Sequence, residues 1–248
     1  MHSHEIAKEG RAENADGGEE ALLDNPIWNA LRTEHSEYAQ VEGEARRYEP
    51  AIGPLAGAPD QSAESYDALR PLAGPGGVLA LFFPDQPAPG SGWSLFRGGV
   101  LTQMIWRGRE PIEVEALNRD VVMRRLGAED VAAMVELATL TEPGPFRDGT
   151  IELGNFYGVL EGERLLAMAG QRMRVPGFVE VSAVCTHPDA RGRGYAGALM
   201  SRVMRDIVAE GATPFLHAFA DNPAVSLYRK LGFVERRRFE LAVIKRED

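Results

Sequence analysis

The segment from residue 180 to residue 196 constrains the fold of this chain more than any other. Its valines, Val181 and Val184, belong to an apolar run of the kind found in buried strands. A Pro-Asp turn follows, then the sequence Arg-Gly-Arg-Gly and an alanine-rich stretch that begins a helix. In such a loop the backbone amides can converge on an anion, because glycine has no Cβ and the helix dipole adds a positive end. With Arg191 and Arg193 adding charge, the segment predicts a strand–loop–helix unit that binds phosphate.

Two phosphate-binding patterns fit this loop. The glycines at 192, 194 and 197 satisfy the dinucleotide fingerprint, and Asp221 lies at about the spacing of a ribose-binding acid, about 20 residues on. In that fingerprint, however, the first glycine stands at the end of the strand, whereas here His-Pro-Asp-Ala-Arg intervenes. Too little chain follows for a full nucleotide-binding half. A dinucleotide enzyme is therefore a distant alternative.

The second pattern, Arg191-x-x-Gly194-x-Ala196, resembles the pyrophosphate loop of the GNAT family of N-acetyltransferases, whose ligand is acetyl-CoA. Further along, Asn-Pro-Ala at 222–224 and Ser-Leu-Tyr-Arg-Lys-Leu-Gly-Phe at 226–233 resemble the last helix of that family and the turn after it. Both blocks stand in the family's order, and the resemblance covers roughly residues 116–248. The chain looks most similar to members that carry the acetyltransferase domain after a divergent N-terminal half.

Composition sets looser bounds. The 248 residues suffice for one large or two small domains, and no apolar run reaches the roughly 18 residues of a membrane helix. The N-terminus lacks the apolar core of a secretory signal, and a single cysteine excludes an internal disulfide and a cysteine-based metal cluster. We therefore expect a cytoplasmic protein with no metal and no membrane partner. The net charge of −10 argues against nucleic acid and mildly favours a cationic acceptor such as an amine.

The pattern divides the chain into three segments. Residues 1–23 are acidic with few apolar side chains, which predicts a disordered tail. Residues 24–115 mix short helices and strands without a glycine-rich loop, and we expect an N-terminal α/β half there. The resemblance raises the hypothesis that this half is a degenerate copy of the same fold. Its Trp28, Trp93 and Trp106 are candidates either for the core or for an acceptor pocket.

Residues 116–248 predict the succession β-α-β-β-β-α-β-α-β, a mixed sheet with helices on both faces. The pattern therefore predicts a mixed α/β fold class, and the resemblance implies a GNAT acyltransferase fold with an additional N-terminal α/β half. The expected strands include 155–160, 164–175, 178–186, 215–220 and 234–245, and the expected helices include 193–210, ended by Gly211, and 223–231.

The resemblance also implies which residues hold acetyl-CoA. Backbone amides of the loop would bind the pyrophosphate, at Arg191, Gly192, Arg193, Gly194, Tyr195 and Ala196. The pantetheine arm would pair with the strand at Val184, Cys185 and Thr186, where the amide of Val184 is a natural donor to the thioester oxygen. Asn222 and Ser226 would contact the arm directly or through water. Nothing in the sequence positions a base for Cys185, so we expect it to pack in the core rather than act as a nucleophile.

Acetyl transfer to an amine also needs a proton donor for the leaving thiolate and an acceptor for the ammonium proton. Tyr228 occupies the family's donor position, and a phenol pKa near 10 is close to that of a thiol; the alternative is a core tyrosine. Glu180 lies four residues before Val184, a spacing that resembles the catalytic glutamate of the histone-acetylating branch. Because side chains alternate between the two faces of a strand, Glu180 and Val184 lie on the same face unless a bulge intervenes. An exposed strand-end charge is the alternative for Glu180, and His217 is a second candidate base.

These observations predict an N-acetyltransferase in which a primary amine, on a small molecule or a peptide, attacks acetyl-CoA directly. The alternative from another class is a non-catalytic module of the same fold that binds or senses CoA. Tyr228 together with an acceptor-side acid favours the enzyme. The sequence leaves open whether the protein is a monomer or a homodimer.

Overall fold

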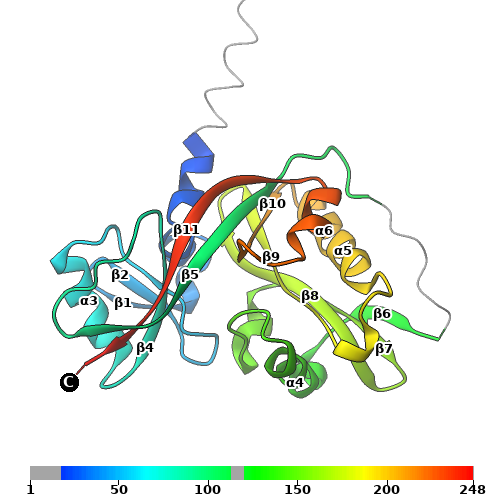
Figure 1. The fold of residues 1–248 in the computed structure, drawn as a ribbon, viewed down its shortest axis with the longest axis horizontal. Helices are drawn as coiled ribbons and strands as arrows, with labels where there is room; N and C mark the ends of the chain where they lie inside the picture. Colours follow the sequence, from blue (N-terminus) through cyan, green and yellow to red (C-terminus); the bar gives the residue numbers. More distant parts are fainter. Residues whose placement is uncertain (1–17, 113–119, 248) are drawn as a thin grey trace, which may run out of the picture.

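The computed structural model describes residues 18–112 and 120–247. Within these residues eight strands form one mixed sheet, in the order β4-β11-β5-β10-β9-β8-β7-β6, and three short strands form a second sheet (Figure 1). The large sheet comprises β4 (Val78–Phe83), β5 (Trp93–Trp106), β6 (Val122–Arg125), β7 (Phe156–Glu161), β8 (Arg164–Val175), β9 (Phe178–Thr186), β10 (Thr213–Phe219) and β11 (Phe233–Arg246). The small one comprises β1 (Ala39–Glu42), β2 (Ala45–Tyr48) and β3 (Ala56–Gly57). A mixed α/β fold is thereby confirmed.

The α-helices of the described residues pack on both faces of the large sheet or beside the small one. They are α2 (Pro26–Arg32), α3 (Ala63–Ala73), α4 (Val131–Thr141), α5 (Tyr195–Ala209) and α6 (Val225–Lys230). Short 3-10 helices lie at η2 (Ala21–Asp24), η3 (Ser36–Tyr38), η4 (Ala128–Asp130), η5 (Asp148–Leu153) and η6 (Pro188–Ala190). Among the described residues, no helix is both long and apolar enough to cross a membrane.

Strands from the two parts of the chain alternate along one half of the large sheet. β11 lies between β4 and β5, and β5 in turn lies between β11 and β10, with antiparallel pairing throughout. The N-terminal part therefore contributes hydrogen-bonded strands to the sheet that carries the glycine-rich loop. The predicted boundary at residue 115 lies outside the described residues, and the degenerate-repeat hypothesis stays a prediction.

The middle of the sheet opens between β9 and β10. These parallel strands pair only where Thr213, Pro214 and Phe215 face residues 178–180. Beyond that point β9 follows β8 and β10 follows β5, so the sheet divides into two arms, which Figure 1 shows spread apart. From residue 181 onward, no strand among the described residues pairs with β9 on the edge that faces β10. This divergence leaves backbone groups of β9 free for a ligand.

Helix α5 packs on one face of the sheet and sets the position of the loop before it. Its buried face follows the spacing Leu199, Val203 and Ile207, each fully buried in the core cluster that also holds residues of β7, β9 and α6. Gly211, with φ +79°, ends the helix as predicted, because the Ala212 amide donates to the Ile207 carbonyl. The opposite face of the sheet packs on α2 and α4, around separate apolar clusters.

The structure bears on two expectations about the N-terminal part: the disordered tail and the role of the tryptophans. Residues 18–23, assigned to the disordered tail, are ordered: Leu23 is fully buried, and Glu20 forms ion pairs with Arg107 and Arg236. Residues 1–17 lie outside the described part. Trp93 and Trp106 pack in the core rather than around an acceptor pocket, which was the alternative considered for them.

Candidate functional site

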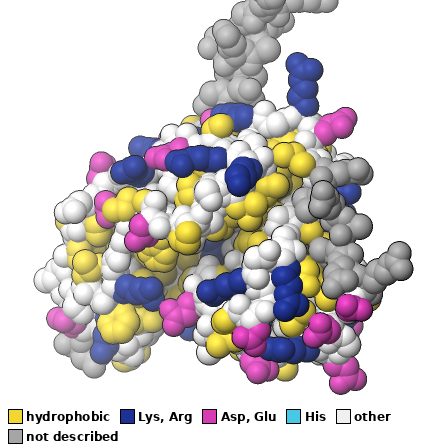
Figure 2. All heavy atoms as spheres, turned by 45° about the vertical axis from the view of Figure 1, so that its right-hand side comes forward, with side chains coloured by type: hydrophobic (Ala, Val, Ile, Leu, Met, Phe, Trp, Pro, Cys, Tyr) yellow, Lys and Arg dark blue, Asp and Glu magenta, His cyan; other side chains and the backbone are white. Residues whose placement is uncertain are grey.

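Two cavities meet where β9 and β10 diverge. The inner cavity, of about 540 Å³, lies between the arms of the sheet and is lined by β4, β5, β9, β10, β11 and the segment after α4. The loop groove, of about 660 Å³, runs over the loop before α5. Four residues line both: Glu142, Pro143, Val184 and Asn222. Figure 2 shows hydrophobic side chains around the hollow between the arms. A ligand in the loop groove can therefore reach a second ligand in the inner cavity at Val184.

The loop before α5 presents unpaired backbone amides. Gly192 and Gly194 have φ of +77° and +79°, a region that glycine enters freely, and no atom lies within 4 Å of a Cβ built at either position. The first amide to enter the helix ladder is that of Ala198, which donates to the Gly194 carbonyl. The amides of residues 192–197 have no acceptor in the described part of the chain. The geometry is that of an anion site at the N-terminus of a 15-residue helix.

The arginine side chains of the loop contact backbone carbonyls of the segment just before it. Arg191 Nε is 3.4 Å from the Thr186 carbonyl, and Arg193 Nη2 donates to the Asp189 carbonyl at 3.1 Å, both at the exposed surface. Each side chain thus has a backbone acceptor and also lines the loop groove. All of the predicted loop residues line that groove: Arg191, Gly192, Arg193, Gly194, Tyr195 and Ala196.

Strand β9 carries a bulge at the point where the cavities meet. Ala183 has φ +52°, and the register shifts from Met168 opposite Cys185 to Gly170 opposite Ser182. As a result Ala183 and Cys185 both pack in the cluster with α4, while Val184 packs toward α5. Val184 and Glu180 therefore lie on opposite faces of the strand, because the bulge interrupts the alternation of side chains. Val184, Cys185 and Thr186 all line the loop groove.

The Cys185 thiol is buried, and burial raises its pKa to about 11. A thiol held protonated is a poor nucleophile. This observation supports the predicted packing role.

Tyr228 lies on α6 and lines the inner cavity with only 7% of its surface exposed. No described residue forms a hydrogen bond with its hydroxyl group, and burial raises the pKa of the phenol to about 12. Asn222 Oδ1 accepts from the Ala224 amide at 2.8 Å, so this side chain caps the turn before α6. Ser226 is exposed and donates to the Pro223 carbonyl at 3.0 Å; it lines neither cavity.

Glu180 lies in a fully buried ion pair. Its two oxygens accept from Arg172 Nε at 2.8 Å and Arg172 Nη2 at 2.9 Å, and His217 Nδ1 is 2.8 Å from Oε1. Burial alone would raise the pKa of this carboxyl, but the charge of Arg172 and the hydrogen bonds from Arg172 and His217 outweigh it and lower the pKa to about 2. Glu180 itself lines neither cavity, whereas Arg172 and His217 both line the inner one.

The protonation pattern of His217 follows from Gln103. The amide of Gln103 is oriented by two bonds: Oε1 accepts from Arg236 Nη1 at 2.9 Å, and Nε2 donates to the Leu23 carbonyl at 2.9 Å. Its second N–H then points at His217 Nε2, 3.0 Å away, which must be the acceptor. His217 therefore carries its proton on Nδ1 and donates it to Glu180. Both ring nitrogens are engaged within the protein.

Comparison with known proteins agrees with this geometry. A family model described as FR47-like protein matches residues 156–241. A solved structure from Novosphingobium aromaticivorans, assigned to the GNAT family of acetyltransferases, is 40% identical, with a TM-score of 0.82 over 91% of this chain and 99% of that one. The chain belongs to the GNAT family. No curated protein sequence matches it.

More distant GNAT structures share the fold alone. A GCN5-related N-acetyltransferase from Kribbella flavida has a TM-score of 0.62 at 14% identity, covering 90% of this chain and 95% of that one. A GCN5-related N-acetyltransferase-like protein from Streptococcus suis has a TM-score of 0.60 at 15% identity, covering 95% and 99%. These alignments extend over nearly the whole chain, so the fold shared with them includes the N-terminal part.

Several residues that line the cavities of this GNAT protein are not marked by any motif in its sequence. Arg172 lies between Gln171 and Met173, two residues before Arg174, so no contrast with its neighbours and no motif distinguishes it in the sequence. Glu142 ends α4 in the left-handed region, with φ +47°, just before a proline. Arg97 lies on β5, far from any motif. Neither Glu142 nor Arg97 has a partner among the ion pairs of the described residues.

Proposed function

We propose that this protein transfers an acetyl group from acetyl-CoA to a primary amine, on a small molecule or a peptide, by direct attack of the amine. The observation that carries the proposal is the meeting of the two cavities at Val184. The loop groove has a volume of about 660 Å³ and is lined by the loop whose amides are free, which suits a nucleotide with a pantetheine arm. The inner cavity reaches the same point from the opposite side of the strand opening.

The residues present fit acetyl-CoA as the acyl donor. Free amides at residues 192–197 suit a pyrophosphate, and the unpaired edge of β9 suits an extended arm with amide groups of its own. Bound acetyl-CoA supplies a thioester carbonyl that an amine can attack. Two groups of the chain support this step: the amide of Val184, as the donor to the carbonyl oxygen, and the hydroxyl of Tyr228, as the proton donor to the departing sulfur.

Tyr228 suits a donor role because its hydroxyl has no protein partner in the described structure and its raised pKa keeps it protonated at neutral pH. We expect Tyr228→Phe to lower the rate of CoA release by ~10²–10⁴-fold while CoA still stabilises the protein, since the ring continues to pack. Tyr157→Phe is a matched control, because that buried tyrosine bonds to Asp206 and lines neither cavity. Full turnover of Tyr228→Phe in a chemistry-limited assay would show that Tyr228 only packs.

Two carboxylates compete for the role of proton acceptor. Glu180 was predicted from its spacing, yet its oxygens are bonded to Arg172 and His217 inside the protein. Glu142 is exposed and lines both cavities, where the attacking amine must stand. The geometry thus supports Glu142 as the base and Glu180 as a residue that positions others. An acidic limb of the rate–pH profile that survives in Glu180→Gln and disappears in Glu142→Gln supports this assignment, and the reverse result restores Glu180.

A further inference from the structure

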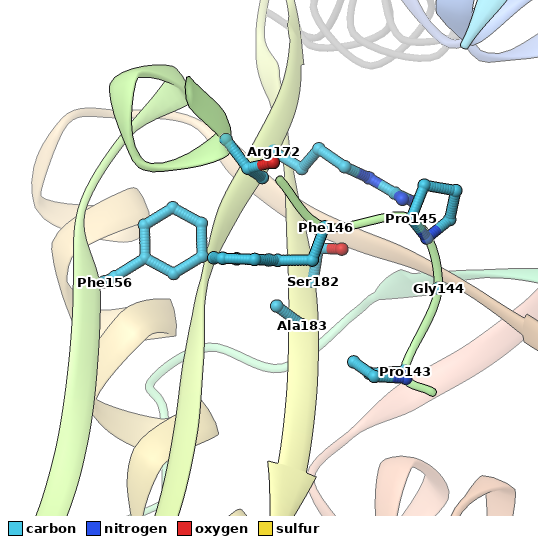
Figure 3. A pocket seen from close by; sticks show the side chains of 9 residues that line it. Pro143, Gly144, Pro145, Phe146, Phe156, Arg172, Ser182 and Ala183 are labelled. Atoms are coloured by element: carbon cyan, nitrogen blue, oxygen red, sulfur yellow. The ribbon is translucent and has the colours of Figure 1, made fainter. Parts of the chain in front are cut away.

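Part of the Arg172 guanidinium faces the inner cavity without a partner. Its side chain is only 10% exposed, and its Nε and Nη2 atoms both donate to Glu180. The third nitrogen, Nη1, has no acceptor among the described residues and lies 3.7 Å from a Cβ built on Gly144. Figure 3 shows the guanidinium extending toward the segment of Pro143, Gly144 and Pro145. Because Nη1 faces the cavity and has no acceptor in the described part of the protein, its N–H groups can donate to an oxygen atom of a ligand bound there.

The position of Nη1 is fixed before any ligand arrives. Glu180 holds the guanidinium by two parallel hydrogen bonds, which constrain its plane. His217 holds Glu180, and Gln103 in turn holds His217. Arg236 completes the series by bonding Gln103 and the Glu20 carbonyl. A donor held by such a network loses little conformational entropy on binding, which favours selective recognition.

The rest of the inner cavity combines an apolar wall with polar and charged side chains that lie apart from one another. Phe82, Leu101 and Leu241 form one wall, on β4, β5 and β11, and Phe146 belongs to the segment after α4. Glu142 lies where the cavity meets the loop groove, so an ammonium group there gains a negative neighbour. A volume of about 540 Å³ suits a molecule of modest size with an apolar body.

We infer that the acceptor is a primary amine on an apolar body that also carries a carboxylate or carbonyl oxygen, which accepts hydrogen bonds from Arg172 Nη1. This inference rests on the proposed function and narrows its acceptor class. The ion pair with Glu180 neutralises the Arg172 charge, so both an amide carbonyl and a carboxylate can bind. A free amino acid and the amino terminus of a peptide are the two sources of this chemistry, and the experiment separates them.

The test compares matched amines that differ only in the oxygen group. Phenylalanine carries a carboxylate, phenylalaninamide a carbonyl, and phenethylamine neither; leucine, leucinamide and 3-methylbutylamine form a second series. Thiol release from acetyl-CoA gives kcat/KM for each. We expect an oxygen-bearing member to exceed the oxygen-free amine by on the order of 10- to 100-fold, as for a hydrogen bond to a charged group. Preference for the acid indicates a free amino acid, and activity with the amide indicates a carbonyl.

A pair of double variants assigns the preference to Arg172. Arg172→Gln with Glu180→Gln removes the buried ion pair without leaving a lone charge, and it should reduce the preference to within a few-fold. Arg174→Gln with Glu210→Gln removes a surface ion pair, 2.8 Å long, between the strand that carries Arg172 and the end of α5, and should keep the preference. If the first double variant does not fold, inhibition of the wild type replaces it: N-acetylphenylalanine or its amide should inhibit more strongly than N-acetylphenethylamine.

Equal kcat/KM for the three amines of a series overturns the inference, as does the absence of both turnover and inhibition for every oxygen-bearing member. Failure of the proposed function has a different signature. If CoA binds and oxygen-free amines are acetylated with a kcat/KM at least equal to that of their oxygen-bearing counterparts, acetyl transfer stands and the inference falls. If CoA does not raise the thermal stability of the protein, the proposed function itself falls.

Discussion

Replacing Glu180 by glutamine tests the buried ion pair at the centre of the sheet. In the folded protein the pKa of this carboxyl is lowered to about 2, from 4.5 for an unperturbed glutamate. A folded pKa below the unfolded one means that the ionised group stabilises the fold. By linkage the difference corresponds to about 3 kcal/mol of unfolding free energy at pH 7. This agrees with the roughly 3–5 kcal/mol measured when one partner of a buried ion pair is removed.

The sign of the pH dependence follows from the same shift. The stabilisation is fully present above pH 4.5 or so and is lost as the pH falls toward 2, because the unfolded state takes up the proton first. At pH 3.5 the wild type should have lost roughly 1 kcal/mol of this contribution, whereas Glu180→Gln has none to lose. Urea unfolding at both pH values should therefore show the gap between wild type and variant narrowing from about 3 to about 2 kcal/mol.

Glu210→Gln is the matched control, because Glu210 pairs with Arg174 at the surface with 41% of its side chain exposed. Surface pairs contribute at most about 1 kcal/mol, so this variant should stay close to the wild type at both pH values. The account of a charged buried pair would be refuted by either of two results. The first is a difference in unfolding free energy between wild type and Glu180→Gln below about 1 kcal/mol, and the second is a difference that does not change with pH.

Two further predictions concern the loop and the N-terminal segment. Gly194→Val should abolish the thermal shift caused by CoA, while Gly211→Val, which has the same φ of +79° but lies at the other end of α5, should lose similar stability and keep the shift. Leu23→Ala should lower the free energy of unfolding by about 2–5 kcal/mol, measured in urea, because Leu23 is fully buried; the same change at the partly exposed Leu22 should have a much smaller effect. A CoA shift retained in Gly194→Val, or equal losses for the two leucines, would contradict these arguments.

Much of the second half could be predicted from the sequence. β9 and β8 have the expected bounds, 178–186 and 164–175, and α5 ends at Ala209, close to the predicted end at residue 210, with Gly211 in the left-handed conformation after it. These features depend on local causes: apolar periodicity, the conformational freedom of glycine and the geometry of a helix terminus. The loop residues and Tyr228 lie around the two cavities for the same reason, since their positions follow from the strand and helices that carry them.

The sequence by itself determined the GNAT-type unit of strand, loop and helix, because every cause of that unit lies within a few residues of it. Tertiary structure alone decided the rest. β5 enters the sheet between β10 and β11 through pairings such as Met104 with Leu216, more than 100 residues apart, which no local pattern encodes. Likewise the spacing of Glu180 along its strand could not reveal Arg172 and His217 on the neighbouring strands. Whether a carboxylate faces a substrate or an ion pair depends on the side chains brought beside it, and those are set by the pairing of distant strands.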